Sequence, residues 1–299
     1  MIKILIIDDS SADQRIDRFL KRNFQNLSQS FIEKNLRKKN ILLNKHLTKS
    51  NQIIKVDDKI TIKNFSEEIY QKFDRKKSNL TINKSLITNF KKSILYENDN
   101  FLIIDKWSGI ASQGGSNIVI SIDTIIKNIS ENYNLVHRLD KETSGLMIIA
   151  KNLKYIRLFG KLFKSQKLKK IYLAICDGMP KLKESYVDLN IKNNSDKVIK
   201  TQTFYKILSY NNKTSLIKFE PQTGKKHQLR IVAKNLGCPI VGDIKYNLNS
   251  NKQKENLKLN AFMLEFDIED NQFKITSSIP KDFTDYLKFK DIKFNSKII

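Results

Sequence analysis

Residues 136–151 read VHRLDKETSGLMIIAK, and this stretch joins a polar loop to an apolar run. The apolar run, LMIIAK, has the length and composition of a buried strand. In the loop before it, a single carboxylate, Asp140, lies between Arg138 and Lys141. Positive neighbours favour the ionised form of a carboxyl group. The pattern therefore predicts that Asp140 stays charged at neutral pH, either as a nucleophile or base or as the polar residue of a turn.

The regions beyond this stretch predict the fold class. From residue 94 onward, short β-rich runs such as KIYLAICDG (170–178) and FMLEFDI (262–268) alternate with single helices. Long helices do not follow each strand in turn, as they do in a doubly wound parallel fold. We therefore expect an α+β domain over residues 91–299, with a mainly antiparallel mixed sheet and flanking helices.

The first 63 residues predict a smaller unit. DQRIDRFLKRNF (13–24) places its apolar residues on one face of a helix and its basic residues largely on the other. QSFIEKNLRKKN (29–40) predicts a second helix that ends in a basic cluster, and two strand-like runs follow it. We expect a small domain over residues 13–63. The polar stretch 64–90 shows no strong periodicity, and we expect a linker there.

The charge of the chain favours a polyanionic partner. The formal net charge is +24 and the pI is about 9.8, which points to nucleic acid rather than to a membrane. Only eight of the 55 basic residues are Arg, and Lys serves wherever charge alone is needed, so the Arg positions are informative. Arg15, Arg18 and Arg37 on the two basic helices are candidate RNA contacts. The alternative is that these helices present a solvated face.

Other classes of protein have little support. Cys176 and Cys238 lack metal-ligand spacing, and we expect buried free thiols in a reducing compartment. Because the sequence has no phosphate loop, dinucleotide fingerprint or Cys/His cluster, we expect no metal and no nucleotide cofactor. The absence of a signal peptide and of a membrane-spanning run predicts a cytoplasmic protein with no membrane partner. KILIIDD (3–9) resembles the first strand of a receiver domain, but the later strands of that fold are not found. No apolar heptad repeat is present, and we expect a monomer.

Two further residues are candidates for a site with Asp140. Tyr172, in KKIYLAI, either stacks on a base turned out of RNA or is a half-buried strand residue. Arg230, in PQTGKKHQLRI (221–231), either clamps a carboxylate through both arms of its guanidinium or is a surface cation. If the three residues meet, we expect Arg230 to hold Asp140 in the two-pronged manner.

Four blocks of the chain resemble one family and occur in its order. HRLDKETSGLMIIAK resembles the signature of a large family of RNA pseudouridine synthases. LYENDNFLIIDKWSGI (95–110), KKIYLAICDG and PQTGKKHQLRIVAKNLGCPIVGDIKY are similar to its entry, tyrosine and arginine motifs. The resemblance covers residues 94 to about 285, and residues 13–63 resemble the small S4-like RNA-binding domain. The chain departs from the family's usual residues at a few positions, namely Trp107, Lys225, Lys226, Ala233 and Asn260.

The resemblance implies a reaction and a set of site residues. Asp140 would be the nucleophile or catalytic base, Tyr172 would stack on the uracil and remove the final proton, and Arg230 would orient Asp140. The expected substrate contacts are His137, Arg138 and Leu229, with Arg15, Arg18 and Arg37 on the N-terminal helices. Uridine and pseudouridine are isomers, so no cofactor is implied. The implied substrate is large-subunit ribosomal RNA. The alternatives are tRNA or another ribosomal RNA helix, a non-catalytic assembly factor that binds ribosomal RNA, and a metal-dependent nuclease or deaminase.

Overall fold

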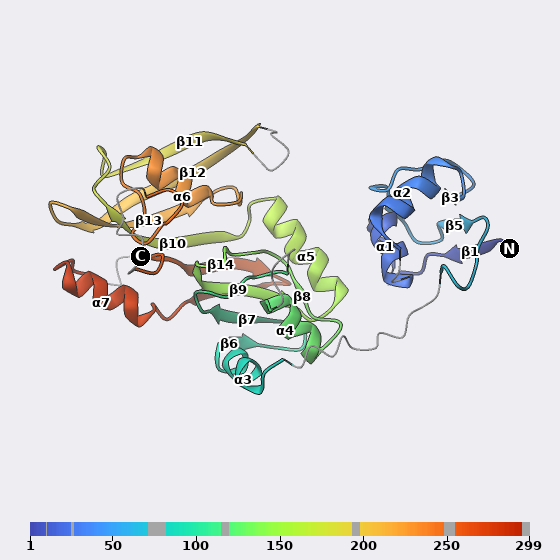
Figure 1. The fold of residues 1–299 in the computed structure, drawn as a ribbon, viewed down its shortest axis with the longest axis horizontal. Coiled ribbons are helices and arrows are strands. Elements are labelled where there is room, and N and C mark those ends of the chain that lie inside the picture. Colours follow the sequence, from blue (N-terminus) through green and yellow to red (C-terminus); the bar gives the residue numbers. More distant parts are fainter. Residues whose placement is uncertain are drawn as a thin grey trace. The chain divides into compact units, whose positions relative to one another are not determined.

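A computed structural model describes residues 1–9, 11–24, 27–70, 82–114, 120–192, 198–247 and 255–294. The chain divides into an N-terminal unit, residues 1–81, and a C-terminal unit, residues 82–299 (Figure 1). No helix in the described ranges is long and apolar enough to cross a membrane.

The N-terminal unit combines short strands with two helices. β1 (Lys3–Ile6), β5 (Lys59–Ile62) and β3 (Ile41–Leu43) form an antiparallel sheet in the order β1-β5-β3, and β2 (Gln14–Arg15) pairs with β4 (Ile53–Ile54). The helices are α1 (Ile16–Asn23) and α2 (Gln29–Arg37) (Figure 1). The predicted apolar face of α1 is buried in the core of the unit, through Ile16, Phe19, Leu20 and Phe24.

The N-terminal unit extends beyond both ends of the predicted domain. β1 lies upstream of residue 13 and pairs along its length with β5, so the unit starts earlier than expected. At the other end, Phe65 and Tyr70 stack on each other and pack against Phe24. The predicted linker is therefore shorter than 64–90. Only two aromatic side chains, Phe65 and Tyr70, attach this segment to the core of the unit. Two isolated residues make no periodic pattern, so nothing in the sequence indicated the attachment.

The predicted linker is also shorter at its C-terminal end. Residues 71–81 lie outside the described residues, and α3 (Lys84–Lys92) belongs to the C-terminal unit. The side chain of Phe90 anchors α3, since it is buried against α4 (Ile122–Ile129) and the sheet.

The C-terminal unit is built on one large sheet (Figure 1). Its strands follow the order β11-β12-β13-β10-β14-β9-β7-β6, with β15 added to β14 and β8 added to β9. The bounds are β6 (Ile94–Glu97), β7 (Phe101–Lys106), β8 (Asn134–Leu135), β9 (Ser144–Ala150), β10 (Lys169–Asp177), β11 (Glu184–Lys192), β12 (Val198–Tyr210), β13 (Thr214–Pro221), β14 (Leu259–Ile268) and β15 (Asn271–Thr276). The pairing of β9 with β14 is parallel, and the other described pairings in this sheet are antiparallel. The predicted α+β class with a mainly antiparallel mixed sheet is confirmed.

Helices cover both faces of this sheet. On one face, α3 and α4 pack at the β7–β9 end and α6 (Gln228–Asn235) packs over β10, β12 and β13. On the opposite face lie α5 (Leu153–Lys164) and α7 (Lys281–Phe289). Tyr172 contacts two clusters of buried side chains on this face: the α6 cluster, which includes Leu229, and the α3/α4 cluster, which includes Phe90. It therefore lies between the part of the face covered by α6 and the part covered by α3 and α4. Both cysteines are buried and free, as predicted.

The strand after the Asp140 loop is anchored by a glycine. β9 is buried along its whole length, as its apolar run predicts. Ser144 and Gly145 are the first residues of β9. Gly145 has φ +108°, and a Cβ there would lie 2.3 Å from the carbonyl oxygen of Ala261. Glycine is therefore required for the close parallel approach of β9 to β14.

Candidate active site

The backbone next to Asp140 is held by a buried serine. The backbone N–H of Leu139 donates to Ser112 Oγ at 2.9 Å, and the Ser112 hydroxyl donates to the Leu139 carbonyl at 2.6 Å. The side chain of Leu139 is buried in the α3/α4 cluster. This pair of hydrogen bonds fixes the residue that precedes Asp140 and hence the direction in which the carboxylate leaves the loop.

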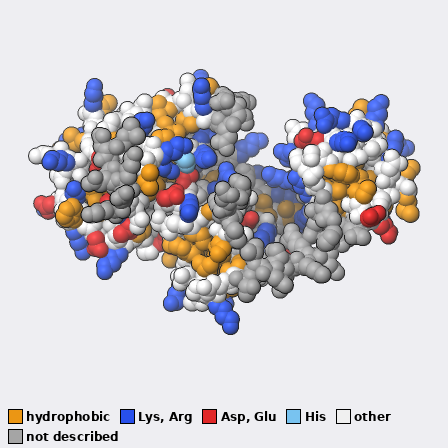
Figure 2. Space-filling view, in the orientation of Figure 1, with side chains coloured by type: hydrophobic (Ala, Val, Ile, Leu, Met, Phe, Trp, Pro, Cys, Tyr) orange, Lys and Arg blue, Asp and Glu red, His pale blue; other side chains and the backbone are white. Residues whose placement is uncertain are grey.

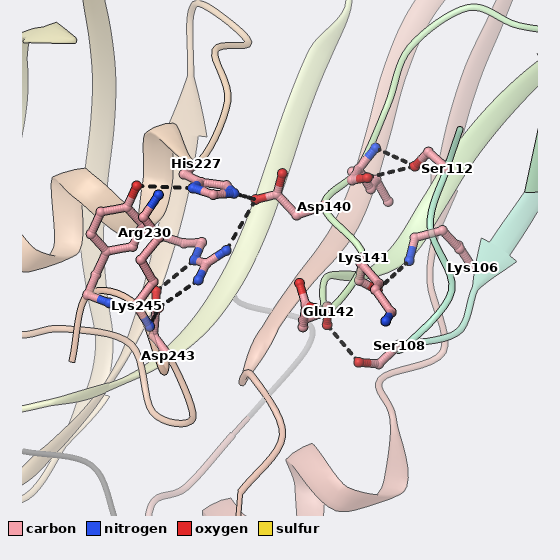
Figure 3. A network of polar contacts seen from close by, with 12 residues as sticks. Lys106, Ser108, Ser112, Asp140, Lys141, Glu142, His227, Arg230, Asp243 and Lys245 are labelled. Atoms are coloured by element: carbon pink, nitrogen blue, oxygen red, sulfur yellow. Dashed lines mark hydrogen bonds and ion pairs between the residues drawn. The ribbon is translucent and has the colours of Figure 1, made fainter. Parts of the chain in front are cut away.

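A buried lysine holds the other side of the same loop. Lys106 Nζ donates to the carbonyl oxygens of Trp107, Ile110 and Lys141, at 3.0 to 3.2 Å. Burial lowers the pKa of Lys106 to about 8, although the negative charges of Glu142 and Asp140 oppose this shift. The Ser108 hydroxyl also donates to the Glu142 carbonyl at 2.7 Å (Figure 3). Residues 106–112 thus hold the loop that carries Asp140 through both backbone and side-chain hydrogen bonds.

Asp140 points across to residues that begin α6 (Figure 3). Its Oδ2 lies 3.8 Å from Arg230 Nη1 and 3.9 Å from His227 Nε2. Both separations exceed hydrogen-bond length, so these are close electrostatic contacts that leave Asp140 free to move onto a substrate atom. Asp140 keeps 26% of its side chain exposed, whereas Arg230 keeps 8%.

The fork of Arg230 is occupied by a different carboxylate. Arg230 Nε and Nη2 each donate to Asp243 at 2.7 Å, and the side chain of Asp243 is fully buried. The backbone N–H groups of Lys245 and Tyr246 also donate to Asp243. The expected two-pronged clamp of Asp140 by Arg230 is therefore wrong. The bidentate partner is Asp243, and Arg230 presents its remaining nitrogen to Asp140.

His227 is the second group facing Asp140. It has a left-handed backbone conformation, φ +58°, at the start of α6, and its Nδ1 is 3.0 Å from the hydroxyl of Tyr246. Burial lowers the pKa of His227, and the charges of Arg230 and nearby lysines lower it further, while Asp140 raises it. The imidazole is therefore neutral near pH 7, and its contact with Asp140 is polar rather than an ion pair.

Tyr172 completes the group of predicted catalytic residues. It is half-buried on β10, opposite Phe219, and packs with Leu229 in the α6 cluster. Burial raises the pKa of the Tyr172 phenol above its ordinary value, and the negative charge of Asp140 raises it further. Its proton is therefore retained at neutral pH. The structure thus brings together Asp140, Tyr172, Arg230 and Leu229, from segments that are far apart in the sequence.

The two residues that precede Leu139 differ in their contacts within the described structure. His137 Nε2 accepts a hydrogen bond from the Ile148 N–H at 2.9 Å, and its ring lies 4.9 Å from that of Phe163. Burial, with a smaller effect of Lys170, lowers the pKa of His137 to about 3. The half-buried His137 thus anchors the loop on β9, and its expected contact with RNA stays a prediction. Arg138 is exposed and makes no hydrogen bond or ion pair with the described residues.

The N-terminal candidates belong to the other unit. Arg18 and Arg37 are exposed on α1 and α2, whereas Arg15 donates two hydrogen bonds to the buried carboxylate of Asp17. Part of the guanidinium of Arg15 is therefore already paired within the N-terminal unit. Figure 2 shows Lys and Arg side chains gathered on one side of this unit and hydrophobic side chains on another.

Sequence reasoning missed several residues of the site. Lys106 is the last residue of β7, a strand that is otherwise mostly apolar and buried. A lysine at such a position could have indicated a buried structural cation. Asp243 lies in VGDIKY, within the stretch that resembles the arginine motif, but nothing local shows that it faces Arg230. Ser112 leaves no comparable trace. None of the described His, Cys, Asp and Glu residues form a group of three or more that could hold a metal ion.

Comparisons with known proteins assign this arrangement to a family. A family model described as RNA pseudouridylate synthase matches residues 100–235. Ribosomal large subunit pseudouridine synthase C of Rickettsia felis is 38% identical, over 81% of this chain and 85% of that protein. The protein of the same name in Rickettsia typhi is 35% identical, over 94% of this chain and 99% of that protein. The chain therefore belongs to the RNA pseudouridylate synthase family, as the motifs predicted.

More distant relatives agree with this assignment. Ribosomal large subunit pseudouridine synthase C of Buchnera aphidicola, from Acyrthosiphon pisum, is 30% identical over 96% of each chain. Among solved structures, human RNA pseudouridylate synthase domain containing 4 superposes with a TM-score of 0.61 at 23% identity. The match covers 71% of this chain and 98% of the human one, and it shows a shared fold.

Proposed function

We propose that this chain is an isomerase that converts uridines to pseudouridine in large-subunit ribosomal RNA. The observation that carries the proposal is the position of Asp140, on a loop held by Ser112 and Lys106, facing Arg230 and next to Tyr172. The relatives that are 30–38% identical over most of the chain are named for this activity. They favour large-subunit ribosomal RNA over tRNA and over a non-catalytic assembly factor.

The proposed reaction breaks one bond and forms another at the same sugar carbon. The glycosidic bond between N1 of uracil and C1′ breaks, the base turns, and C5 bonds to C1′ in its place. The proton on C5 is then lost and N1 gains one, so the atoms balance without a cofactor. The carboxylate of Asp140 acts on the nucleotide as nucleophile or base. Arg230 Nη1 holds it, and Asp243 holds Arg230.

Tyr172 has two parts in this scheme. Its half-buried ring offers a surface on which uracil stacks, with Leu229 beside it. Its phenol retains a proton because burial and Asp140 raise its pKa. The phenol oxygen therefore takes the C5 proton only while its own proton passes to Asp140. Arg138, which is exposed beside the loop, fills the space that the flipped nucleotide leaves.

The N-terminal unit is proposed to be an S4-like RNA-binding domain. Its two helices and the turn after α2 present exposed basic residues, namely Arg18, Lys21, Arg22, Lys34, Arg37, Lys38 and Lys39. Side chains of this kind contact phosphates without reading sequence.

A pseudouridine map of total RNA tests the proposed function. Cells with and without the gene are compared at every uridine of the large-subunit ribosomal RNA and of tRNA. We expect one or more large-subunit positions to lose pseudouridine. Loss at tRNA positions alone would contradict the proposed substrate, and an unchanged map would contradict the activity.

A further inference from the structure

A pocket outside the described site opens beside the first residues of β10. It has a volume of about 190 Å³ and lies between the α5–β10 connection and the end of β13. Its walls include Leu168, Lys169 and Lys170 from the first side and Glu220, Pro221 and Gln222 from the second. None of these residues takes part in the chemistry derived above.

The pocket lies on the same face of the sheet as Tyr172. Alternate residues of a strand share a face. On β10, Tyr172 and Ala174 pack towards α6, whereas Ile171 and Leu173 pack on the opposite side. Lys170 therefore projects on the Tyr172 side. Two residues of strand span about 7 Å, so the pocket begins about that far from the uracil-stacking position.

The neighbouring strand supports the same placement. Phe219 of β13 is the cross-strand partner of Tyr172, and Pro221, in the pocket wall, lies two residues further along that strand. The bulge beside Tyr172 does not disturb this alternation. Ile171 pairs with Met263 and Tyr172 with Ala261, so the extra residue is Phe262 of β14.

Lys170 lacks a counter-charge in the described structure. Its side chain is half-buried and makes no hydrogen bond or ion pair with the described residues. Desolvation lowers its pKa, and its positive charge in turn lowers the pKa of His137, two residues before Leu139. The acidic group of the pocket, Glu220, is already paired with Lys218 at 2.8 Å. A partly buried cation without a partner is unfavourable, and a bound anion would offset that cost.

We propose that this pocket binds a phosphodiester of the RNA substrate, next to the uridine taken up at Tyr172, with Lys170 as its cationic ligand. The inference rests on the proposed function, because RNA is the anion that the catalytic site brings within reach. Exposed Lys169 adds positive charge at the rim. The pocket would fix the backbone on one side of the flipped nucleotide, while Arg138 occupies the gap in the stack.

The proposed phosphate contact of Lys170 is tested with two substitutions, Lys170→Met and Lys170→Arg, and one control. Lys167→Met is the matched control, since Lys167 is exposed, close in sequence and outside the pocket wall. The ligand is an RNA stem-loop that carries the mapped uridine. We expect Lys170→Met to weaken binding about tenfold and to flatten the slope of log affinity against log salt by roughly 0.7–0.9, the amount for one lost phosphate contact. Lys170→Arg should bind like the parent.

Thermal unfolding separates binding from a structural role. The fold disfavours the charge on Lys170, so Lys170→Met should melt no lower than the parent while RNA binding falls. A lower melting temperature with unchanged RNA binding would show a structural lysine and would overturn the proposal. Equal losses of affinity in Lys170→Met and Lys167→Met would also overturn it, because the effect would then be unspecific charge.

A double-mutant cycle locates the phosphate. Stem-loops in which a neutral methylphosphonate replaces one linkage beside the target uridine are bound to the parent and to Lys170→Met. At the linkage that Lys170 contacts, we expect the methylphosphonate to weaken binding by the parent and to leave binding by Lys170→Met unchanged. Additive losses at each linkage would refute the contact. If the parent binds but forms no pseudouridine, the proposed function fails. If it forms pseudouridine and the coupling is zero, only the pocket assignment fails.

Discussion

Arg230 joins two carboxylates with different tasks. Asp243 is fully buried and receives the two-pronged contact, whereas Asp140 is partly exposed and lies 3.8 Å from the remaining nitrogen. Only a planar guanidinium can make both contacts from one position. Asp243 is therefore a positioning residue that acts on the catalytic carboxylate through Arg230.

Arg230→Lys should impair the enzyme severely although the charge is kept. A lysine cannot reproduce the fork, so Asp243 would be left with an incomplete partner, and we expect a loss of roughly 1–3 kcal/mol in the free energy of unfolding. We expect kcat/KM to fall at least about tenfold. Single-turnover rates and urea unfolding measure the two effects. Near-parental activity of Arg230→Lys would mean that charge alone suffices at this position. Asp243→Asn removes the charge that holds Arg230 and should also lower both stability and kcat/KM; parental values would contradict the positioning role of Asp243.

Tyr172→Phe and Tyr172→Ala separate the two parts of the tyrosine. Phe keeps the stacking ring, so we expect base detachment to proceed and the final proton loss to stall. Ala should also weaken substrate binding, by about 1–3 kcal/mol of lost stacking. Release of tritium from 5-tritiated uridine, together with binding of the stem-loop, measures both steps. A fully active Phe variant would show that only the ring matters.

At the scale of elements, the 106–112 segment is the support of the catalytic loop. Lys106 places its ammonium among three carbonyl oxygens of this segment and of the loop. Lys106→Met keeps the side-chain length and removes all three donors. We expect a loss of about 1–3 kcal/mol in the free energy of unfolding and a lower kcat.

The same lysine gives a pH signature. Burial lowers its pKa to about 8 in the folded protein, against 10.5 ordinarily. Between these values the unfolded chain binds more protons than the folded one, so this group makes the free energy of unfolding rise with pH from about 8 to about 10.5. Unfolding of the parent and of Lys106→Met is compared across this window. Parallel curves would contradict the shift.

The elements that sequence predicted best are those whose own residues carry the pattern. Most of β9 is an apolar run, and α1 buries Ile16, Phe19 and Leu20 at helical spacing. α2 begins directly after Ser28, whose hydroxyl accepts from the Phe31 N–H. The partner of Arg230 was not predictable from sequence. Asp243 is thirteen residues further along the chain, and only the path of the folded loop places it beside Arg230. The same applies to Tyr70, whose burial depends on contacts distant in sequence.

At the scale of the whole molecule, the proposed catalytic residues and the basic helices belong to different units. Deleting residues 1–81 should therefore leave a folded C-terminal unit that still isomerises a short stem-loop. Affinity for a large-subunit RNA fragment should fall, and the salt slope should flatten by about 3–4 if four of the exposed basic residues meet phosphates. Binding at several salt concentrations measures this. An unchanged slope would mean that the helices are a solvated face.

The central claim is that the carboxylate of Asp140 performs the isomerisation, and one exchange tests it most directly. Asp140→Asn keeps the shape of the side chain and removes its charge. The parent and the variant are each returned to cells that lack the gene, and pseudouridine is mapped in the large-subunit ribosomal RNA. The account predicts that the parent restores the modification and that the variant, folded and still binding RNA, restores less than about 1% of it. Restoration by Asp140→Asn at the parental level would contradict the account.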